Sequence, residues 1–242
     1  MQYTLRNIPP DLDRALKARA KQVGKSVNQF AVEALARSVG QPIRVRSLRG
    51  MDEVIPGILH WKAKHTNIGV EVSSYLLTDS GTALDPLLAD GQIVDGIERA
   101  VLTVRHHIRS TPGLGVPVFV HRSGLHEFEG TDVDVRGYEA GDELVPGVRV
   151  LPFGRICPDD AVLHIALGDG VLAFGDGIIQ YGGIGHPPDQ YIGDDPEAIK
   201  ADIVEGLVPL LDEDFDTLLF AHGDPVAAGG KQMLREFVES RS

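Results

Sequence analysis

A change of charge and of sequence texture near residue 50 is the feature that most constrains the fold of this 242-residue chain. Residues 1–50 contain ten Lys and Arg and three Asp and Glu, which gives a net charge of +7. Residues 51–242 contain 13 basic and 32 acidic residues, a net charge of -19. So steep an asymmetry predicts two modules with different partners, of which only the basic one suits a polyanion. The alternative is that residues 1–50 are only a solvated basic face.

The composition excludes several classes of protein. Apolar residues make up 43% of the chain and charged residues 24%, which excludes a collagen, a disordered tail and a coiled-coil rod. No apolar run reaches the roughly 18 residues of a membrane span, and the first residues do not have the pattern of a signal peptide. The single Cys157 cannot form an intrachain disulfide. We therefore expect a cytoplasmic protein with no membrane partner.

The basic module has the periodicity of one strand and two helices. Residues 2–6 alternate polar and apolar side chains, and the two prolines at 9 and 10 end that strand. A helical pattern opens at Asp11 and ends at Gly24, with an apolar stripe of Leu12, Leu16, Ala20 and Val23. Ser26 and Gln29 have the spacing of a capping box that opens a second helix, which ends before Gly40. Three such elements in forty residues cannot bury a core alone, so we expect a dimer in which the two strands pair.

Paired strands of this kind would present Gln2, Thr4 and Arg6 from each chain. Such donor-rich side chains can read base edges in the major groove, which admits a two-stranded ribbon. The start of the second helix, from Lys25 through Ser26 and Val27 to Asn28, offers free backbone N–H groups to a phosphate. The module thus favours binding to double-stranded DNA.

Residues 2–40 resemble a ribbon-helix-helix DNA-binding module of the Arc/MetJ kind, and most closely its antitoxin-type members. The polar–aromatic–polar–apolar–Arg ribbon at 2–6 and the Gly-Lys-Ser-Val-Asn turn at 24–28 carry the resemblance. It implies base reading by residues 2, 4 and 6 and phosphate contacts by residues 25–28. The alternative is a dimerisation module that does not bind DNA.

Residues 41–50 are short, basic and without a helical stripe, so we interpret them as a linker. The acidic module, 51–242, has the pattern of an α/β layered sandwich. Met51 could itself begin a protein, which leaves a fusion of two reading frames as an alternative. Nine short apolar runs predict strands, at 58–61, 72–77, 82–85, 100–103, 116–121, 148–153, 161–167, 171–174 and 217–221. Helices are predicted at 196–211 and 230–240, with shorter ones near 92–99 and 107–112.

Several motifs in this module resemble the metallo-β-lactamase superfamily in their order along the chain. Asp85-Pro86 fits its first turn after a strand, and residues 101–109 (VLTVRHHIR) occupy the place of its strand and His-x-His-x-Asp-His motif. Residues 153–158 (FGRICP) fall where its Pro-Gly-His-Thr-Pro-Gly is expected. A strand leading to Asp176 and a last strand leading to His222-Gly223 follow. The resemblance implies a four-layer αββα sandwich over 51–242. Together with the first module, the expected fold class is α/β, with a small ribbon-helix-helix at its N-terminus.

The resemblance also implies a degenerate metal site. Of the seven ligand positions that it assigns, three keep a metal-binding residue, namely His106, Asp176 and His222. The other four hold residues that cannot ligate a dication, namely Val104, Ile108, Arg109 and Arg155. We therefore expect no metal cofactor and no catalytic residues, with zinc or another divalent metal at a partial site as the alternative. His107 or His121 could replace a lost ligand.

Two arginines in a former metal cavity suggest a different use for it. Arg109 and Arg155 are expected to flank Asp176 and His222 as a buried ion-pair cluster. The alternative is that they grip a small anionic ligand.

These observations predict a dimeric, DNA-binding, regulator-like protein with a non-hydrolytic second domain. A metal-dependent hydrolase with a rearranged site is the first alternative, and an antitoxin-type repressor is the second.

Overall fold

The computed structural model describes residues 9–22, 27, 51–89, 92 and 94–241. The chain divides into two units, Met1–Ser47 and Leu48–Ser242, which we call the small and the large unit. No helix in the described ranges is long and apolar enough to cross a membrane.

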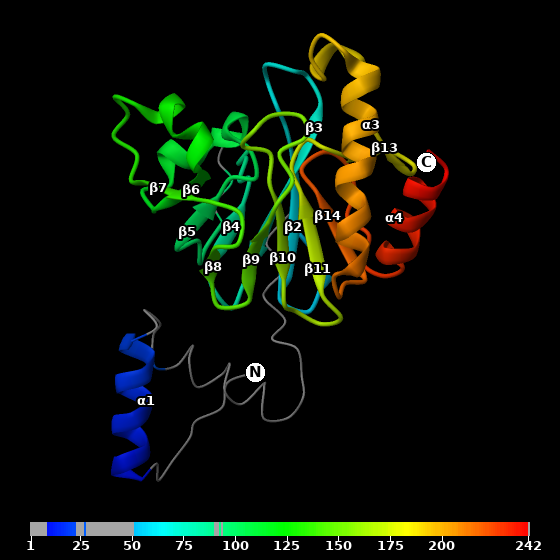
Figure 1. Ribbon diagram of the computed structural model, residues 1–242. Coiled ribbons are helices and arrows are strands. Elements are labelled where there is room, and N and C mark those ends of the chain that lie inside the picture. The colour runs from blue at the N-terminus through cyan, green and yellow to red at the C-terminus, as the bar shows by residue number, and fades with distance from the viewer. Residues whose placement is uncertain (1–8, 23–26, 28–50, 90–91, 93, 242) are drawn as a thin grey trace. The chain divides into compact units, whose positions relative to one another are not determined.

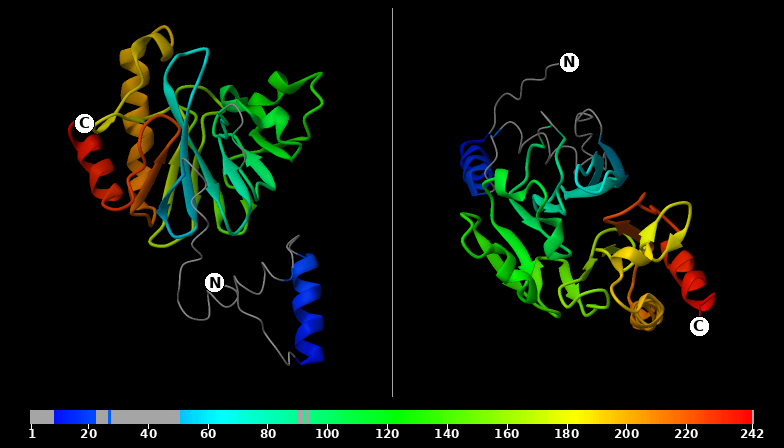
Figure 2. Two further views of the ribbon diagram at one scale, coloured as in Figure 1. Left: turned by 180° about the vertical axis from the view of Figure 1, so that it is seen from behind. Right: turned by 90° about the horizontal axis from the view of Figure 1, so that it is seen from above.

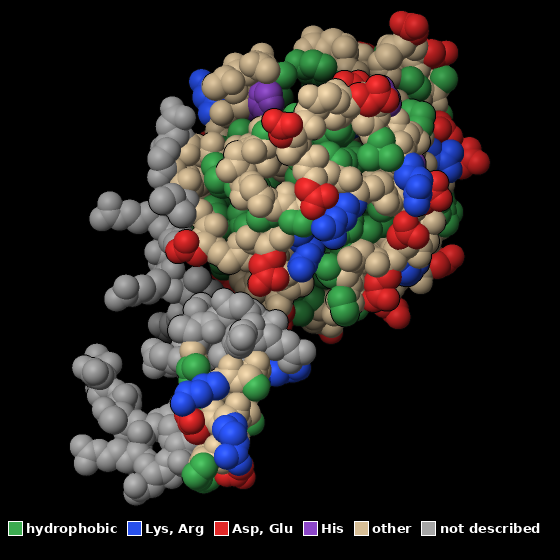
Figure 3. Space-filling view, turned by 90° about the vertical axis from the view of Figure 1, so that its left-hand side faces the viewer, with side chains coloured by type: hydrophobic (Ala, Val, Ile, Leu, Met, Phe, Trp, Pro, Cys, Tyr) green, Lys and Arg blue, Asp and Glu red, His purple; other side chains and the backbone are tan. Residues whose placement is uncertain are grey.

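Helix α1, Pro10–Gln22, is the described element of the small unit (Figure 1). Pro10 opens it, and Asp11 and Asp13 lie in its first turn, where the helix dipole favours acids. Leu12 of the predicted apolar stripe is 49% exposed in the single chain. Basic, acidic and apolar side chains all lie on this helix, and acidic and basic side chains are interspersed on the visible face of the large unit (Figure 3).

Most of the residues predicted to contact DNA lie outside the described ranges. They are Gln2, Thr4, Arg6, Lys25, Ser26 and Asn28. Val27 is described and is helical, with its side chain 37% exposed. The expected strand at 2–6 and the remainder of the second helix also fall outside the described residues.

Two β-sheets form the centre of the large unit. The seven-stranded sheet has the order β1-β2-β3-β4-β5-β6-β7. Its strands are β1 (Asp52–Ile55), β2 (Ile58–Lys64), β3 (Glu71–Leu77), β4 (Thr82–Leu84), β5 (Arg99–Val101), β6 (Val118–His121) and β7 (Val135–Tyr138). Strands β1 to β4 pair antiparallel, and β4 to β7 pair parallel.

The five-stranded sheet has the order β14-β11-β10-β9-β8. Its strands are β8 (Glu143–Val145), β9 (Val148–Leu151), β10 (Val162–Ile165), β11 (Val171–Phe174) and β14 (Thr217–Phe220). Strands β11 and β14 pair parallel, and the other neighbours pair antiparallel. A separate antiparallel sheet of two short strands, β12 (Ile179–Gln180) and β13 (Ile184–Gly185), follows β11 along the chain.

The largest cores lie between the two sheets and outside the five-stranded sheet. Ile58, Tyr75 and Leu84 of one sheet share a core with Leu163 and Leu219 of the other. Helices α3 (Pro196–Leu207) and α4 (Gly230–Glu239) cover the outer face of the five-stranded sheet (Figures 1 and 2). Their stripes bury side chains such as Ile203 and Leu234 against Phe220.

The outer face of the seven-stranded sheet is covered differently from the expected α-helical layer. Three 3₁₀ helices follow β5 and β6 along the chain, namely η1 (Arg105–Ile108), η2 (Thr111–Gly113) and η3 (Arg122–Phe128). Phe128, Leu125 and Ile108 pack against Leu102 and Val120 there. The helix predicted near 107–112 is therefore two 3₁₀ turns, and the described residues of 92–98 contain no helix. The short 3₁₀ helix η4 (Asp189–Tyr191) precedes α3, and η5 (Val208–Asp212) continues it.

Candidate functional site

The candidate site lies where four strands end. Asp85 follows β4, and Asp176 follows β11 by two residues. His107 lies in η1 after β5, and His222 follows β14 by two residues. Strands β4 and β5 are parallel neighbours in one sheet, and β11 and β14 are parallel neighbours in the other. Carboxyl ends of parallel strands meet at one edge, which brings these four side chains together.

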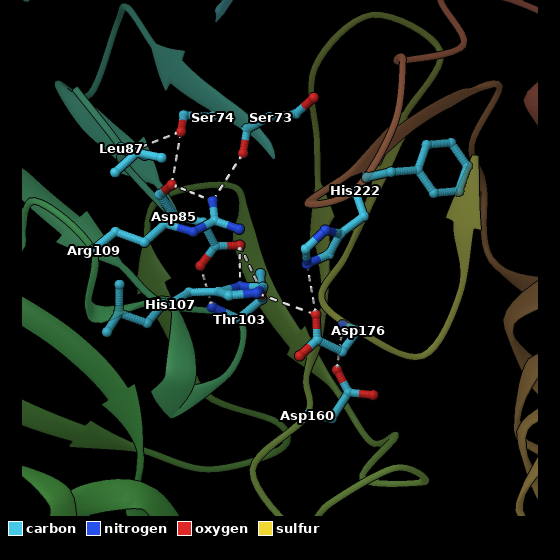
Figure 4. Close-up of polar contacts among 12 residues, drawn as sticks. Ser73, Ser74, Asp85, Leu87, Thr103, His107, Arg109, Asp160, Asp176 and His222 are labelled. Atoms are coloured by element: carbon cyan, nitrogen blue, oxygen red, sulfur yellow. Dashed lines mark hydrogen bonds and ion pairs between the residues drawn. The ribbon is translucent and has the colours of Figure 1, made fainter. Parts of the chain in front are cut away.

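His107 is the centre of this cluster (Figure 4). Its Nδ1 lies 3.2 Å from Oδ2 of Asp85, and its Nε2 lies 3.1 Å from Oδ1 of Asp176. The same Asp176 oxygen lies 3.1 Å from Nε2 of His222. The His107 residue is only 4% exposed, so both of its ring nitrogens are used inside the protein. The result is a continuous chain of alternating acidic and imidazole groups.

Asp85 is held from several sides. Its Oδ1 accepts a 2.8 Å hydrogen bond from the Thr103 backbone N–H, and its Oδ2 accepts a 2.6 Å bond from the Thr103 hydroxyl. The Ser74 hydroxyl donates to the Asp85 carbonyl at 2.8 Å. Asp85 has a φ of 45°, an unusual conformation for a residue that is not glycine. These contacts over-determine the position of the carboxylate that faces His107.

Arg109 closes the cluster on the side of the seven-stranded sheet. Its guanidinium donates to the carbonyls of Ser73 at 3.0 Å and Asp85 at 2.7 Å. Its backbone also has a positive φ, 39°. On the other side, the Asp176 backbone N–H donates to Oδ1 of Asp160 at 3.1 Å.

The charges of the cluster follow from this geometry. Burial and the Arg109 charge lower the pKa of His107, but Asp176 and Asp85 raise it by more, and the resulting pKa is about 9. Burial would raise the pKa of Asp176, yet the charge and hydrogen bond of His107 hold it well below its usual range. His107 also lowers the pKa of Asp85 against the effect of burial. At neutral pH the cluster therefore contains an imidazolium between two carboxylates.

A cavity of about 670 Å³ opens above Asp176 and His222. Its polar lining consists mainly of His65, His106, His107, Arg109, Asp176 and His222. The remaining walls are largely apolar and include Val72, Ile156, Ile179, Tyr181 and Tyr191. Its volume is that of a small-molecule site.

Comparison with known proteins gives a family match for the first residues and a fold match for most of the chain. Residues 2–39 match the family model of the FitA-like antitoxin ribbon-helix-helix. No curated protein matches the chain. The fold is similar to a metallo-β-lactamase family protein from Thermus thermophilus, with a TM-score of 0.54 and 19% identity over 78% of this chain and 80% of that one. It is also similar to a β-lactamase domain protein from Burkholderia ambifaria, with a TM-score of 0.57 and 18% identity over 82% and 79% of the two chains.

A metallo-β-lactamase from Staphylococcus aureus gives a TM-score of 0.53 and 15% identity over 76% of this chain and 66% of that one. The large unit has the metallo-β-lactamase fold. At identities this low, the similarity establishes only the fold of the metallo-β-lactamase-like domain. The chemistry of the domain has to be inferred from its own residues. The expected combination of a ribbon-helix-helix module with this fold is confirmed.

The metallo-β-lactamase-like domain presents His107, rather than the expected His106, to Asp176 and His222. Residues 105–108 form a 3₁₀ turn after β5, so neighbouring side chains point in different directions. The Asp159 carboxylate holds the Arg105 backbone N–H at 2.7 Å and pairs with its guanidinium. His106 is exposed, although it still lines the cavity. His121 caps η3 through a bond from the Ser123 N–H.

Arg155 is not paired with Asp176 as expected. Its guanidinium lies 2.6 Å from Oδ1 of Asp202 on α3. Arg109 does lie in the cluster, but it contacts two backbone carbonyls there. The expected pair of arginines around one carboxylate is thus replaced by one arginine and one histidine. Asp85 and Thr103 were absent from the predicted site residues, although the place of Asp85 after a strand was a usable signal.

The donor set tests whether this domain fits the two metal ions of its fold family. Val104 and Ile108 have hydrocarbon side chains without a ligand atom, and both are packed against apolar neighbours. Among the described residues, His107, Asp176 and His222 each have a ligand atom within 4.8 Å of the other two. Three ligands are enough for one ion, but His107 would have to give up its contact with Asp176. The residues do not fit a two-metal centre.

Proposed function

We propose that this chain is a dimeric DNA-binding protein of the transcriptional-regulator kind, with a metallo-β-lactamase-like domain that does not hydrolyse a substrate. The observation that carries the proposal is the ribbon-helix-helix match over residues 2–39. The net charge of +7 in residues 1–50 supports it, because neutralising phosphates supplies most of the affinity for DNA. Two copies would pair through the strand at 2–6, and the protein would be cytoplasmic.

In this proposal Gln2, Thr4 and Arg6 read base edges from the paired strands. The backbone and side chains from Lys25 to Asn28 contact phosphates at the start of the second helix. The non-hydrolytic role of the second domain is supported by His107, whose two ring nitrogens already contact Asp85 and Asp176.

The test begins with selection of a duplex from a random library by the full-length protein. Binding of that duplex is then measured by fluorescence anisotropy for the parent, Arg6→Ala and Arg14→Ala. Because each bidentate base contact contributes roughly 1–3 kcal/mol, we expect Arg6→Ala to lose tenfold or more in affinity for the selected duplex. Arg14 is an exposed arginine of α1 outside the predicted contacts, so Arg14→Ala is the matched control. Unchanged binding by Arg6→Ala, or failure to select any duplex, would refute the proposal.

A metal-dependent hydrolase is the second candidate, because His107, Asp176 and His222 form a three-ligand group. Metal analysis of the purified protein after dialysis separates the two functions. We expect well under one equivalent of zinc, iron or manganese per chain. One tightly held equivalent that is lost in His222→Ala would favour the hydrolase.

An antitoxin-type repressor is supported by the name of the matching family model. Antitoxin modules usually continue into a short segment that wraps a toxin, whereas a folded domain follows here. Stoichiometric copurification with a small nuclease expressed alongside the chain would favour this role.

A further inference from the structure

We propose that the 670 Å³ cavity of the large unit binds a small carboxylic acid with an apolar body, and that the bound acid is not chemically converted. This inference goes beyond DNA binding and does not depend on it. It rests on the walls of the cavity, on its mouth and on the groups at its floor.

The mouth of the cavity exposes an unusual amount of apolar surface. Seven large hydrophobic side chains are exposed among the described residues, and five of them belong to the large unit. Four of those five line this one cavity, namely Ile68, Val70, Tyr181 and Tyr191. Exposed apolar side chains gathered at one opening indicate a binding site, because scattered ones are normal but clustered ones are costly in water. The walls behind them are apolar as well, so the body of the occupant is apolar.

The floor of the cavity favours an acidic head group. The described lining contains one fixed cation, Arg109, one carboxylate, Asp176, and four imidazoles, which are His65, His106, His107 and His222. That carboxylate already contacts two imidazoles. An ammonium group would therefore meet the fixed charge of Arg109. A carboxylate would instead find a donor there, because Nε of Arg109 is buried and has no hydrogen-bond partner among the described residues.

The same floor argues against turnover of the ligand. Cys157 lines the cavity, but burial and the neighbouring Asp159 and Asp160 raise the pKa of its thiol far above neutral pH, so it is not a nucleophile. His107 is engaged on both ring nitrogens and buried. The described lining contains no serine or threonine, and its one thiol is not activated, so the site is suited to reversible binding.

The experiment is isothermal titration calorimetry of the full-length, chelator-dialysed protein with octanoate and with octanamide, in the absence of DNA. The two probes share the apolar body and differ in the charge of the head group. We expect octanoate to bind and octanamide to bind at least fivefold more weakly. Equal affinities would overturn the acidic head group, and no binding of either would overturn the ligand site.

A matched pair of variants locates the binding. Val70 and Val208 are exposed valines of similar accessibility, 43% and 50%, but only Val70 lines the cavity. We expect Val70→Asp to weaken octanoate binding at least tenfold and Val208→Asp to leave it within twofold of the parent. Equal effects of the two substitutions would place binding elsewhere and refute the proposal. A melting temperature near that of the parent in both variants shows that they remain folded.

Discussion

At the scale of single residues, His107 links the two sheets at the candidate site, because its ring contacts one carboxylate from each of them. Asp85 from one sheet and Asp176 from the other both point at its ring, at 3.2 and 3.1 Å. Without this imidazole between them, Asp85 and Asp176 would keep only the nearby charge of Arg109 and, for Asp176, the contact with His222. The imidazolium therefore joins the two sheets as well as neutralising the cluster.

Replacement of His107 by glutamine is expected to destabilise the large unit by about 3–5 kcal/mol, because it leaves buried carboxylates uncompensated. Urea unfolding followed by fluorescence measures this change. Trp61 is the only tryptophan of the chain and is 1% exposed in β2, so its emission reports on the large unit alone. His106→Gln alters the exposed neighbour and should change the free energy of unfolding by less than about 0.5 kcal/mol. Similar effects of the two substitutions would contradict this role of His107.

The stability of the large unit should also fall in alkaline solution. Folding raises the pKa of His107 from 6.5 to about 9, so its contribution is complete below pH 6.5 and is lost as the pH rises through 9. The loss of stability is about 3 kcal/mol, because each unit of pKa difference between the folded and unfolded states corresponds to about 1.4 kcal/mol. Urea midpoints from pH 6 to pH 10 measure it through Trp61. The same series in His107→Gln should be flatter, and an equally steep fall there would assign the effect to other groups.

At the scale of elements, the position of His222 depends on how the chain leaves β14. The Gln180 N–H of β12 donates to the His222 carbonyl at 2.9 Å, and the Ser73 hydroxyl of β3 donates to the Gly223 carbonyl at 2.6 Å. Gly223 has a φ of +114°, and a Cβ there would collide with the Gln180 backbone. Only glycine allows these segments to approach so closely.

Gly223→Ala is therefore expected to destabilise the large unit by about 1–3 kcal/mol and to displace His222 from Asp176. Urea unfolding measures the first effect, and the NMR shifts of the His222 imidazole report the second. Gly185 of β13 is the control, since its φ is not positive and a Cβ there would meet no heavy atom within 4 Å among the described residues. A Gly223→Ala protein with parent-like stability and parent-like His222 shifts would rule out this constraint.

At the scale of the whole molecule, the proposed dimer depends on the apolar side of α1. Leu12 lies on the predicted stripe and is 49% exposed in the single chain, so it is free to pack against a second copy. We expect light scattering to give twice the chain mass of 26.1 kDa. Leu12→Asp should shift the protein toward monomer and weaken DNA binding in parallel.

Ala18→Asp is the control for that experiment. Residue 18 is exposed and lies two positions from Leu16, so it is on nearly the opposite side of the helix from the predicted stripe. It adds the same charge without touching that stripe. Equal dissociation by both substitutions would point to net charge rather than to the apolar side of α1.

The sequence determined those features that depend on a local pattern. Apolar runs predicted the central strands, and the residues that follow β11 and β14 were correctly located as strand-end side chains. The same patterns missed the short strands β1, β7, β8, β12 and β13. These strands have two to four residues, which is too short for a clear apolar period, whereas the edge strand β14 is entirely buried and was predicted.

Only the tertiary structure decided which side chains form the cluster. The choice of His107 over His106 depends on a 3₁₀ turn whose first residue is held by Asp159, 54 positions away in sequence. Arg155 donates to Asp202, which lies 47 positions away in sequence on α3. Periodicity describes neighbours along the chain, whereas the direction of a side chain in an irregular turn is set by contacts between distant segments.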